Sequence, residues 1–235
     1  MTTYAINGLG RIGKLALRPL LERGANIAWV NDAVGDPAMH AHLLEFDTVH
    51  GRWQADFACD DASVTIDGTR LAVHGESRIA DLPLEAVDVV IDCTGAFKSE
   101  EALAPYFAAG VKKAVVSAPV KDGGAVNLVY GVNHDIYDAA RHRIVTAASC
   151  TTNCLAPVVK VLHENLGIRH GSITTIHDVT NTQTIVDRPA KDLRRARSAL
   201  NSLVPTTTGS ATAIPSGKLC NAMATARVVP NLSPL

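Results

Sequence analysis

The stretch that decides the fold is "YAINGLGRIGKLALRPLLERG", residues 4–24. It opens with "YAIN", which predicts a short strand. Three glycines follow with G-x-G-x-x-G spacing, and leucines at helical spacing continue until Gly24 ends the pattern. A strand, a glycine turn and a helix in this order predict the first βαβ unit of a nucleotide-binding domain.

Each glycine of the motif has its own physical task. Gly8 allows the tight turn, Gly10 lets the backbone approach a pyrophosphate, and Gly13 permits close packing of the helix against the strand. The helix N-terminus adds unpaired N–H groups and the positive end of its dipole. The alternative is a glycine turn that binds nothing, because the motif alone is a weak signal.

The predicted nucleotide is NAD. Asp32 ends the apolar stretch "IAWVND" about 20 residues after the glycines, where a carboxylate accepts hydrogen bonds from both ribose hydroxyls. The same carboxylate repels a 2′-phosphate, so NAD is favoured over NADP.

Strand-like and helical segments alternate through residues 1–149, which predicts an α/β fold with a doubly wound parallel Rossmann sheet. The near-continuous apolar run "VDVVIDCTG" (87–95) is typical of a strand covered on both faces. The stretch 56–75 differs, since it predicts a hairpin around Asp67-Gly68 and therefore an antiparallel insertion. The other expected elements are helices at 100–110 and 149–167 and strands at 112–119, 143–148 and 171–179.

Composition restricts the class of protein. The 235 residues are 47% hydrophobic and 19% charged, which is ordinary for a soluble globular protein. A formal net charge of -1 gives no reason to expect nucleic acid or a membrane as a partner. The five cysteines form no disulfide framework and suit a reducing compartment. With no apolar leader at the N-terminus, the chain is expected to be cytoplasmic.

The second chemical signal is "ASCTTNCLAP", residues 148–157. Cys150 is predicted in the first turn of a helix, where the dipole favours a thiolate, with Ser149 as the N-cap. A buried structural cysteine is one alternative, and a metal site using Cys154 is the other. No second Cys/His pair with zinc spacing lies nearby, so we expect no metal and an inert, packed Cys154. A nucleophilic cysteine needs a base, and His177 at the end of a predicted strand is the candidate.

These stretches together identify a family. From residue 2 to about residue 214 the chain resembles phosphorylating glyceraldehyde-3-phosphate dehydrogenase, an NAD-dependent enzyme of glycolysis. The matching stretches are "AINGLGRIG", "VND", "HLLEFDTVHG", "DCTGAF", "VVSAP", "YGVNH", "ASCTTNCLAP", "TTIHDVTNTQ", "KDLRRAR" and "PTTTG".

The resemblance implies a role for each candidate residue. Cys150 is expected to attack an aldehyde and form a thiohemiacetal, and His177 to hold the thiolate and accept the hydroxyl proton as hydride leaves for NAD. Inorganic phosphate would then cleave the thioester. The positions that match cofactor-lining residues are Gly8, Gly10, Arg11, Ile12, Gly13, Asp32, Arg78, Thr94 and Ser117. Those that match substrate and anion contacts are Ser149, Thr151, Thr180, Arg195, Thr208 and Gly209.

The chain also departs from the family pattern. Arg188 and Ala190 stand where many members have Leu and His, in a loop that borders cofactors in neighbouring subunits of the family's homotetramer. "HLLEFDTVHGRW" and Asp178 are similar to a branch associated with arsenic resistance genes, which is thought to use arsenate as the attacking anion. Phosphate and arsenate therefore both remain candidates.

Three parts are expected along the chain. They are an NAD-binding Rossmann domain at 1–149, an incomplete α+β catalytic domain at 150–214 and an atypical tail at 215–235. The tail carries three prolines and no clear period, so it is predicted to be irregular. Family members run further, so the chain is interpreted as C-terminally truncated, with low stability and weak activity expected from uncovered strands. A catalytically silent NAD-binding remnant and an erythrose-4-phosphate dehydrogenase are the competing hypotheses.

Overall fold

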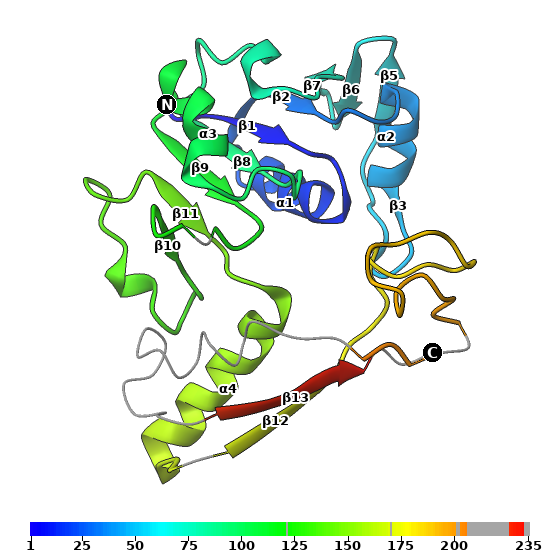
Figure 1. The fold of residues 1–235 in the computed structure, drawn as a ribbon. Coiled ribbons are helices and arrows are strands. Elements are labelled where there is room, and N and C mark those ends of the chain that lie inside the picture. The colour runs from blue at the N-terminus through cyan, green and yellow to red at the C-terminus, as the bar shows by residue number, and fades with distance from the viewer. Residues whose placement is uncertain (121, 170, 201–202, 206–225, 233–235) are drawn as a thin grey trace. The chain divides into compact units, whose positions relative to one another are not determined.

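The computed structural model describes residues 1–235 except 121, 170, 201–202, 206–225 and 233–235 (Figure 1). The chain divides into two compact units. The first contains Met1–Leu128 and Ile136–Ala148, and the second contains Val129–Asp135 and Ser149–Leu235. Within the described ranges, no helix is long and apolar enough to cross a membrane.

The first unit is built on a nine-stranded sheet with the order β10-β11-β9-β8-β1-β2-β7-β6-β5. Its strands are β1 (Thr3–Asn7), β2 (Asn26–Asn31), β5 (Phe57–Asp60), β6 (Ser63–Ile66), β7 (Thr69–His74), β8 (Val89–Asp92), β9 (Lys113–Val116), β10 (Ala125–Asn127) and β11 (Ile144–Thr146). Neighbouring strands from β10 to β7 pair in parallel, whereas β6 pairs antiparallel with both β7 and β5. The predicted Rossmann sheet and its antiparallel insertion are confirmed.

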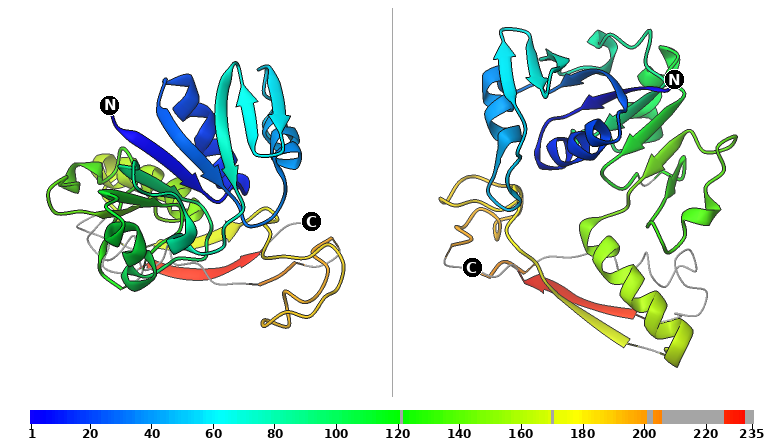
Figure 2. Two further views of the ribbon diagram at one scale, coloured as in Figure 1. Left: turned by 90° about the horizontal axis from the view of Figure 1, so that it is seen from above. Right: turned by 180° about the vertical axis from the view of Figure 1, so that it is seen from behind.

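Helices cover both faces of this sheet. Along β1, Ala5 packs into a core with Leu103 and Tyr106 of α3 (Glu100–Ala108). The next residue, Ile6, packs into a second core on the opposite face. That second core is formed with α1 (Arg11–Glu22) and α2 (Pro37–Glu45). The sheet is therefore doubly wound, as Figure 2 shows from above and from behind. Smaller elements are β3 (Phe46–Asp47), β4 (Gly51–Arg52) and the 3₁₀ helices η1 (Ile79–Asp81) and η2 (His134–Ile136).

The predicted hairpin is present and has a local cause. Asp67 and Gly68 both adopt positive φ, at 47° and 77°, between the paired residues Ile66 and Thr69. A two-residue turn of this kind matches the right-handed twist of the strands, and Asp-Gly is among the few dipeptides that adopt it without large strain. The register of β6 on β7 is therefore set by two adjacent residues.

A buried polar chain ties the carboxyl ends of β2, β1 and β8 to α3. Asn31 Nδ2 donates to Asn7 Oδ1 at 2.7 Å, and Asn7 Nδ2 donates to the Tyr106 hydroxyl at 2.6 Å. Tyr106 in turn donates to Asp92 Oδ2 at 2.8 Å, while the Thr94 hydroxyl donates to the other carboxylate oxygen at 2.7 Å. Burial raises the pKa of Asp92, and these hydrogen bonds oppose that rise. The chain of bonds therefore holds Thr94, a cofactor-lining candidate, through a buried carboxyl group.

Replacing Tyr106 by Phe is expected to lower the free energy of unfolding by about 2–4 kcal/mol. The hydroxyl is the shared partner of Asn7 and Asp92, and its removal takes one hydrogen bond from each of these two buried polar side chains. Denaturant unfolding measures the change. The matched control is Tyr130→Phe, because Tyr130 is 86% exposed, and it should change stability by less than about 0.5 kcal/mol. Equal midpoints for the two variants would contradict the structural role given to the hydroxyl.

The second unit contains α4 (Cys150–Leu166) and a two-stranded parallel sheet of β12 (Gly171–Ile176) and β13 (Ala226–Leu232). The expectation that 215–235 is irregular is therefore wrong for 226–232. The register pairs Ile173 with Val228 and Thr174 with Val229. The sequences of both strands contain β-branched residues, which favour strands. Pro230 lies within β13, and a proline inside a segment argues against predicting a strand from the sequence.

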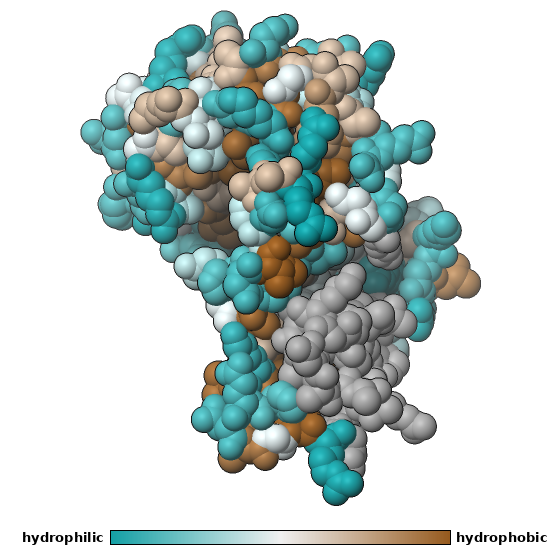
Figure 3. Space-filling view, turned by 90° about the vertical axis from the view of Figure 1, so that its left-hand side faces the viewer, coloured by the Kyte–Doolittle hydropathy of each residue, from teal (hydrophilic) through white to brown (hydrophobic). Residues whose placement is uncertain are grey.

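Helix α4 buries only part of its apolar surface. Ala156 and Val159 are buried, whereas Val158, Val161 and Leu166 are 56%, 60% and 79% exposed. Apolar groups are visible among hydrophilic ones on the side of the molecule shown in Figure 3. The C-terminal half of the helix therefore exposes several apolar side chains.

Candidate functional site

The site in the second unit begins with the cap of α4. Ser149 is the N-cap, and its hydroxyl accepts a hydrogen bond from the Thr152 backbone N–H at 3.2 Å, which confirms the predicted cap. Ala148, just before it, adopts φ +55°, a left-handed conformation that is costly for a residue with a Cβ. Cys150 is thus the first residue of the helix and is exposed.

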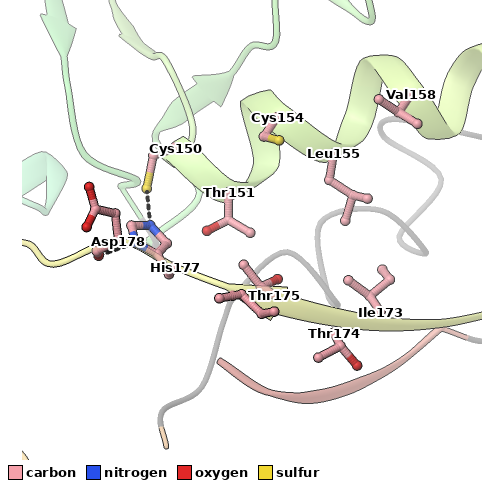
Figure 4. Close-up of a pocket in the computed structure, with 11 residues that line it drawn as sticks. Cys150, Thr151, Cys154, Leu155, Val158, Ile173, Thr174, Thr175, His177 and Asp178 are labelled. Atoms are coloured by element: carbon pink, nitrogen blue, oxygen red, sulfur yellow. Dashed lines mark hydrogen bonds between the residues drawn. The ribbon is translucent and has the colours of Figure 1, made fainter. Parts of the chain in front are cut away.

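Cys150 and His177 meet although 27 residues separate them. Cys150 Sγ lies 3.3 Å from Nε2 of His177 (Figure 4). His177 is the residue that directly follows β12. The other ring nitrogen, Nδ1, lies 2.7 Å from the backbone carbonyl oxygen of Asp178. A carbonyl oxygen only accepts hydrogen bonds, so Nδ1 carries a proton and the neutral ring presents an unprotonated Nε2 to the thiol.

The electrostatics of the pair favour proton transfer from sulfur to nitrogen. Burial raises the pKa of the Cys150 thiol, but the hydrogen bond and charge of His177, followed by hydrogen bonds from Thr151, leave it below its ordinary value. The Asp178 carbonyl raises the pKa of His177, and the hydrogen bond to Cys150 adds to this. Cys93 is a contrast, because burial raises the pKa of its thiol to about 11.

A pocket of about 460 Å³ extends from this pair between α4 and β12. Thr151, Cys154, Leu155 and Val158 line it from one face of the helix, and Figure 4 shows β12 opposite them. Cys154 is exposed in this lining, so the expectation that it is packed is wrong. It lies one helical turn from Cys150, on the same face, because residues four apart share a side of a helix.

The first unit carries the glycine motif, and its geometry fits a dinucleotide. A Cβ on Gly8 would lie 2.6 Å from the backbone of Cys93 and Thr94, whereas one on Gly10 would meet nothing within 4 Å. Gly10 is also the N-cap of α1 and offers no side-chain cap, so the first N–H groups of the helix face an open cradle. The motif follows β1 next to β8, at the point where the strand order reverses, which is where ligands of this fold bind.

The Asp32 carboxylate is held in place by two backbone N–H groups. Its Oδ2 accepts a hydrogen bond from the Leu9 N–H at 2.8 Å, and its Oδ1 accepts one from the Val34 N–H at 3.0 Å. Each carboxylate oxygen keeps a second lone pair for a hydroxyl group. The carboxylate is therefore anchored to the glycine turn itself.

Comparison with known proteins gives a consistent result for both units. The family model described as "Glyceraldehyde 3-phosphate dehydrogenase, NAD binding domain" matches residues 2–100, and the one described as "Glyceraldehyde 3-phosphate dehydrogenase, C-terminal domain" matches 149–232. Glyceraldehyde-3-phosphate dehydrogenase of Geobacillus stearothermophilus is 44% identical over 97% of this chain and 70% of its own length. The chain belongs to the glyceraldehyde-3-phosphate dehydrogenase family.

Other members of the family are also similar. Glyceraldehyde-3-phosphate dehydrogenase 3 of Nostoc sp. is 54% identical over 89% of this chain, and the Streptomyces coelicolor enzyme is 49% identical over 88%. The chain spans 63% and 62% of the lengths of these two relatives. The C-terminal family match runs past residue 214, where the resemblance was expected to end. Binding of NAD is the described role of the family's first domain.

Four of the cofactor-lining candidates lie within two residues after the carboxyl ends of parallel strands, namely Gly8, Asp32, Thr94 and Ser117. Thr94 follows β8, and Ser117 follows β9 with its N–H on the Asp92 carbonyl oxygen at 2.9 Å. Arg11 forms an ion pair with Asp47, and Ile12 beside it is 54% exposed. Arg78 directly precedes η1, and its Nε lies 3.6 Å from Asp81 Oδ2.

The anion candidates are brought together only in part. Thr151 lines the pocket beside Cys150, and Ser149 caps the same helix. Thr180 bonds within its own turn, to Gln183 Oε1 at 2.9 Å, and Arg195 lies 3.9 Å from Asp192. Neither of these two is among the residues that line the pocket. Thr208 and Gly209 fall outside the residues that the structure describes.

Sequence reasoning missed three groups near these sites. They are the Asp47 partner of Arg11, the Tyr106–Asp92 pair behind Thr94, and His40, a buried imidazole close to Asp32. A carboxylate directly after an apolar strand was a usable signal for Asp92, but nothing local marked the other two. In the described part of the chain, no group of three or more His, Cys, Asp or Glu side chains is arranged to hold a metal ion.

Proposed function

We propose that this protein oxidises glyceraldehyde 3-phosphate with NAD and inorganic phosphate, through a thioester on Cys150. The observation that carries the proposal is the 3.3 Å contact between Cys150 Sγ and His177 Nε2, with the thiol pKa lowered and the imidazole pKa raised. Such a pair supplies both a nucleophile and a proton acceptor.

In the first step the Cys150 thiolate adds to the aldehyde carbon. The carbon–sulfur bond forms as the carbonyl electron pair moves to oxygen, and protonated His177 gives that oxygen its proton. The product is a thiohemiacetal, and His177 is left neutral. The Asp178 carbonyl keeps the ring oriented throughout, because it holds Nδ1–H in either protonation state.

In the second step neutral His177 takes the hydroxyl proton back while the carbon–oxygen double bond re-forms. NAD held by the first unit would supply the acceptor for the hydride of this carbon. An anion oxygen then attacks the thioester carbon, the carbon–sulfur bond breaks, and the Cys150 thiolate is restored. We assign the anion contacts to Ser149, Thr151, Thr180, Arg195, Thr208 and Gly209, since hydroxyl, N–H and guanidinium groups suit tetrahedral oxyanions.

The proposed anion is phosphate, and arsenate is expected to replace it because the two have nearly the same charge and shape. Erythrose 4-phosphate shares the aldehyde and phosphate ends, so NADH formation with each sugar tests the substrate. We also propose a homotetramer in the cytoplasm, which light scattering and cell fractionation test.

The reactivity of Cys150 toward iodoacetamide should stay high well below the ordinary thiol pKa of about 8.5. A lowered thiol pKa and a raised imidazole pKa widen the pH range in which the ion pair exists, because the thiolate persists to lower pH and the imidazolium to higher pH. His177→Asn should lower the alkylation rate of Cys150 at neutral pH by about tenfold or more. It should also shift the rise of that rate with pH to higher pH. Peptide mass spectrometry of the alkylated protein measures the rate at each thiol.

The other thiols serve as internal references. Cys93 should react last, because its pKa is about 11 and it is partly buried. Exposed Cys59 is the matched control and should be unaffected by the His177 substitution. Equal labelling of Cys150 and Cys59 would contradict the activated thiol and would favour a protein that binds NAD without catalysis.

A further inference from the structure

We infer that His40 is a positioning residue for the NAD site, which holds the Asp32 loop in its binding shape only while the imidazole is neutral. The inference rests on nucleotide binding by the first unit and is independent of the chemistry at Cys150. It gives the protein a proton-linked affinity for its cofactor.

His40 is an unusual interior residue. It lies on α2 and is only 3% exposed. Among the described residues, neither Nδ1 nor Nε2 meets a hydrogen-bond partner at bonding geometry. Buried polar groups are nearly always paired, and each unpaired one costs about 1–3 kcal/mol. A side chain kept here at that cost calls for a functional explanation.

The ring packs directly against the loop that carries Asp32. A Cβ built on Gly35 would lie 3.1 Å from both His40 Nε2 and Met39 Sδ, closer than ordinary van der Waals contact, so the loop backbone lies against the imidazole with little space for a side chain between them. Gly35 has φ +98°, a conformation that also favours glycine. Val34, the preceding residue, donates its N–H to Asp32 Oδ1. His40 therefore supports the Asp32 carboxylate through two residues of backbone.

The charges around the ring oppose protonation on balance. Burial, and then the positive charge of Lys14 on α1, lower the pKa of His40. Asp32 and Asp36, together with the backbone of Val34, act in the opposite direction but do not overcome these two effects. A proton on His40 would thus place a buried positive charge near half-buried Lys14, and we expect the loop to move away so that water can solvate it.

The sign of the pH effect follows from linkage. The folded protein with its loop in place binds fewer protons than a form with His40 in water, whose pKa is about 6.5. Loop order is therefore complete above that pH and is lost as the pH falls toward the lowered pKa of the folded state. By reciprocity, NAD must lower the pKa of His40 further when it binds.

Calorimetric titration with NAD at about pH 7.5 and about pH 5.5 tests the inference. The dissociation constant of the unmodified protein should rise by about fivefold or more at the lower pH, whereas that of His40→Leu should change by less than about twofold. His42→Leu is the matched control, because His42 is exposed on the same helix, and it should retain the full pH effect.

A second measurement uses the unmodified protein and does not depend on the variant folding. In proton NMR, the His40 ring signal should titrate below the ordinary histidine range, and saturation with NAD should move its midpoint to lower pH. An equal pH effect in His40→Leu, or an NMR midpoint that NAD leaves unchanged, overturns the role of His40. Absence of NAD binding at the higher pH overturns nucleotide binding as well.

Discussion

Replacing Cys150 by Ser is expected to reduce NADH formation from glyceraldehyde 3-phosphate by about 10⁴-fold or more. A hydroxyl is a far weaker acid than a thiol, so an imidazole at the 3.3 Å found for the sulfur cannot ionise it. The thiohemiacetal then fails to form, and the later steps have no substrate. Absorbance of NADH in the presence of phosphate measures the loss.

The matched control is Cys154→Ser, which changes the same atom one helical turn away in the same pocket. It should keep activity within about threefold, since Cys154 lies away from the imidazole and has no step assigned to it. Both variants should bind NAD as the unmodified protein does. Comparable losses in the two variants would contradict the assignment of Cys150 as the nucleophile.

Gly13→Ala should have the second large effect, with the free energy of unfolding lowered by about 3 kcal/mol or more and NAD binding lost. A Cβ at this position would overlap the carbonyl oxygen of Gly8 and would lie 3.4 Å from Cys93 Cβ. Gly8 directly follows β1 and Cys93 directly follows β8, and these two strands are paired neighbours in the sheet, so the backbone cannot easily shift. The turn after β1 would have to open, and the cradle at the start of α1 would open with it.

Gly10→Ala is the matched control, because it should weaken NAD binding without the steric overlap that an added Cβ causes at Gly13. Its φ of -68° suits alanine, and an added Cβ would meet nothing within 4 Å. The free energy of unfolding should therefore fall by no more than about 1 kcal/mol, the cost of alanine in place of glycine at an N-cap, while NAD affinity falls because the methyl group occupies the approach of the pyrophosphate. Denaturant unfolding and calorimetric NAD titration measure the two quantities. A Gly13→Ala protein as stable as Gly10→Ala would contradict the close packing at this turn.

The parts of the fold that the sequence predicts are those with local causes. The glycine spacing after "YAIN" predicts β1 and α1, and the apolar run at 87–95 predicts β8, because each signal lies within one element. Asp67-Gly68 predicts the hairpin because the turn type depends on those two residues. The pairing of β12 with β13 was missed, since its two strands are separated by about 50 residues that carry no register signal.

The site divides in the same way. Ser149, Cys150 and Asp32 are recognised from their places at the ends of strands and the start of a helix. The burial and the hydrogen-bond partners of a side chain are not predictable from the local sequence, because distant segments of the chain supply them. This is why Cys154 was expected to be packed, and why neither the Tyr106–Asp92 pair nor the buried ring of His40 was foreseen.

The left-handed backbone at Ala148 restricts which mutations the gene can accept at this position, two residues before Cys150. Single-base changes of an alanine codon reach valine, threonine, serine, proline, glycine and an acidic residue. Branched side chains are crowded at φ +55°, and proline cannot reach that angle. Glycine and aspartate tolerate this positive φ best, so only a few single-base substitutions at this codon are compatible with the backbone.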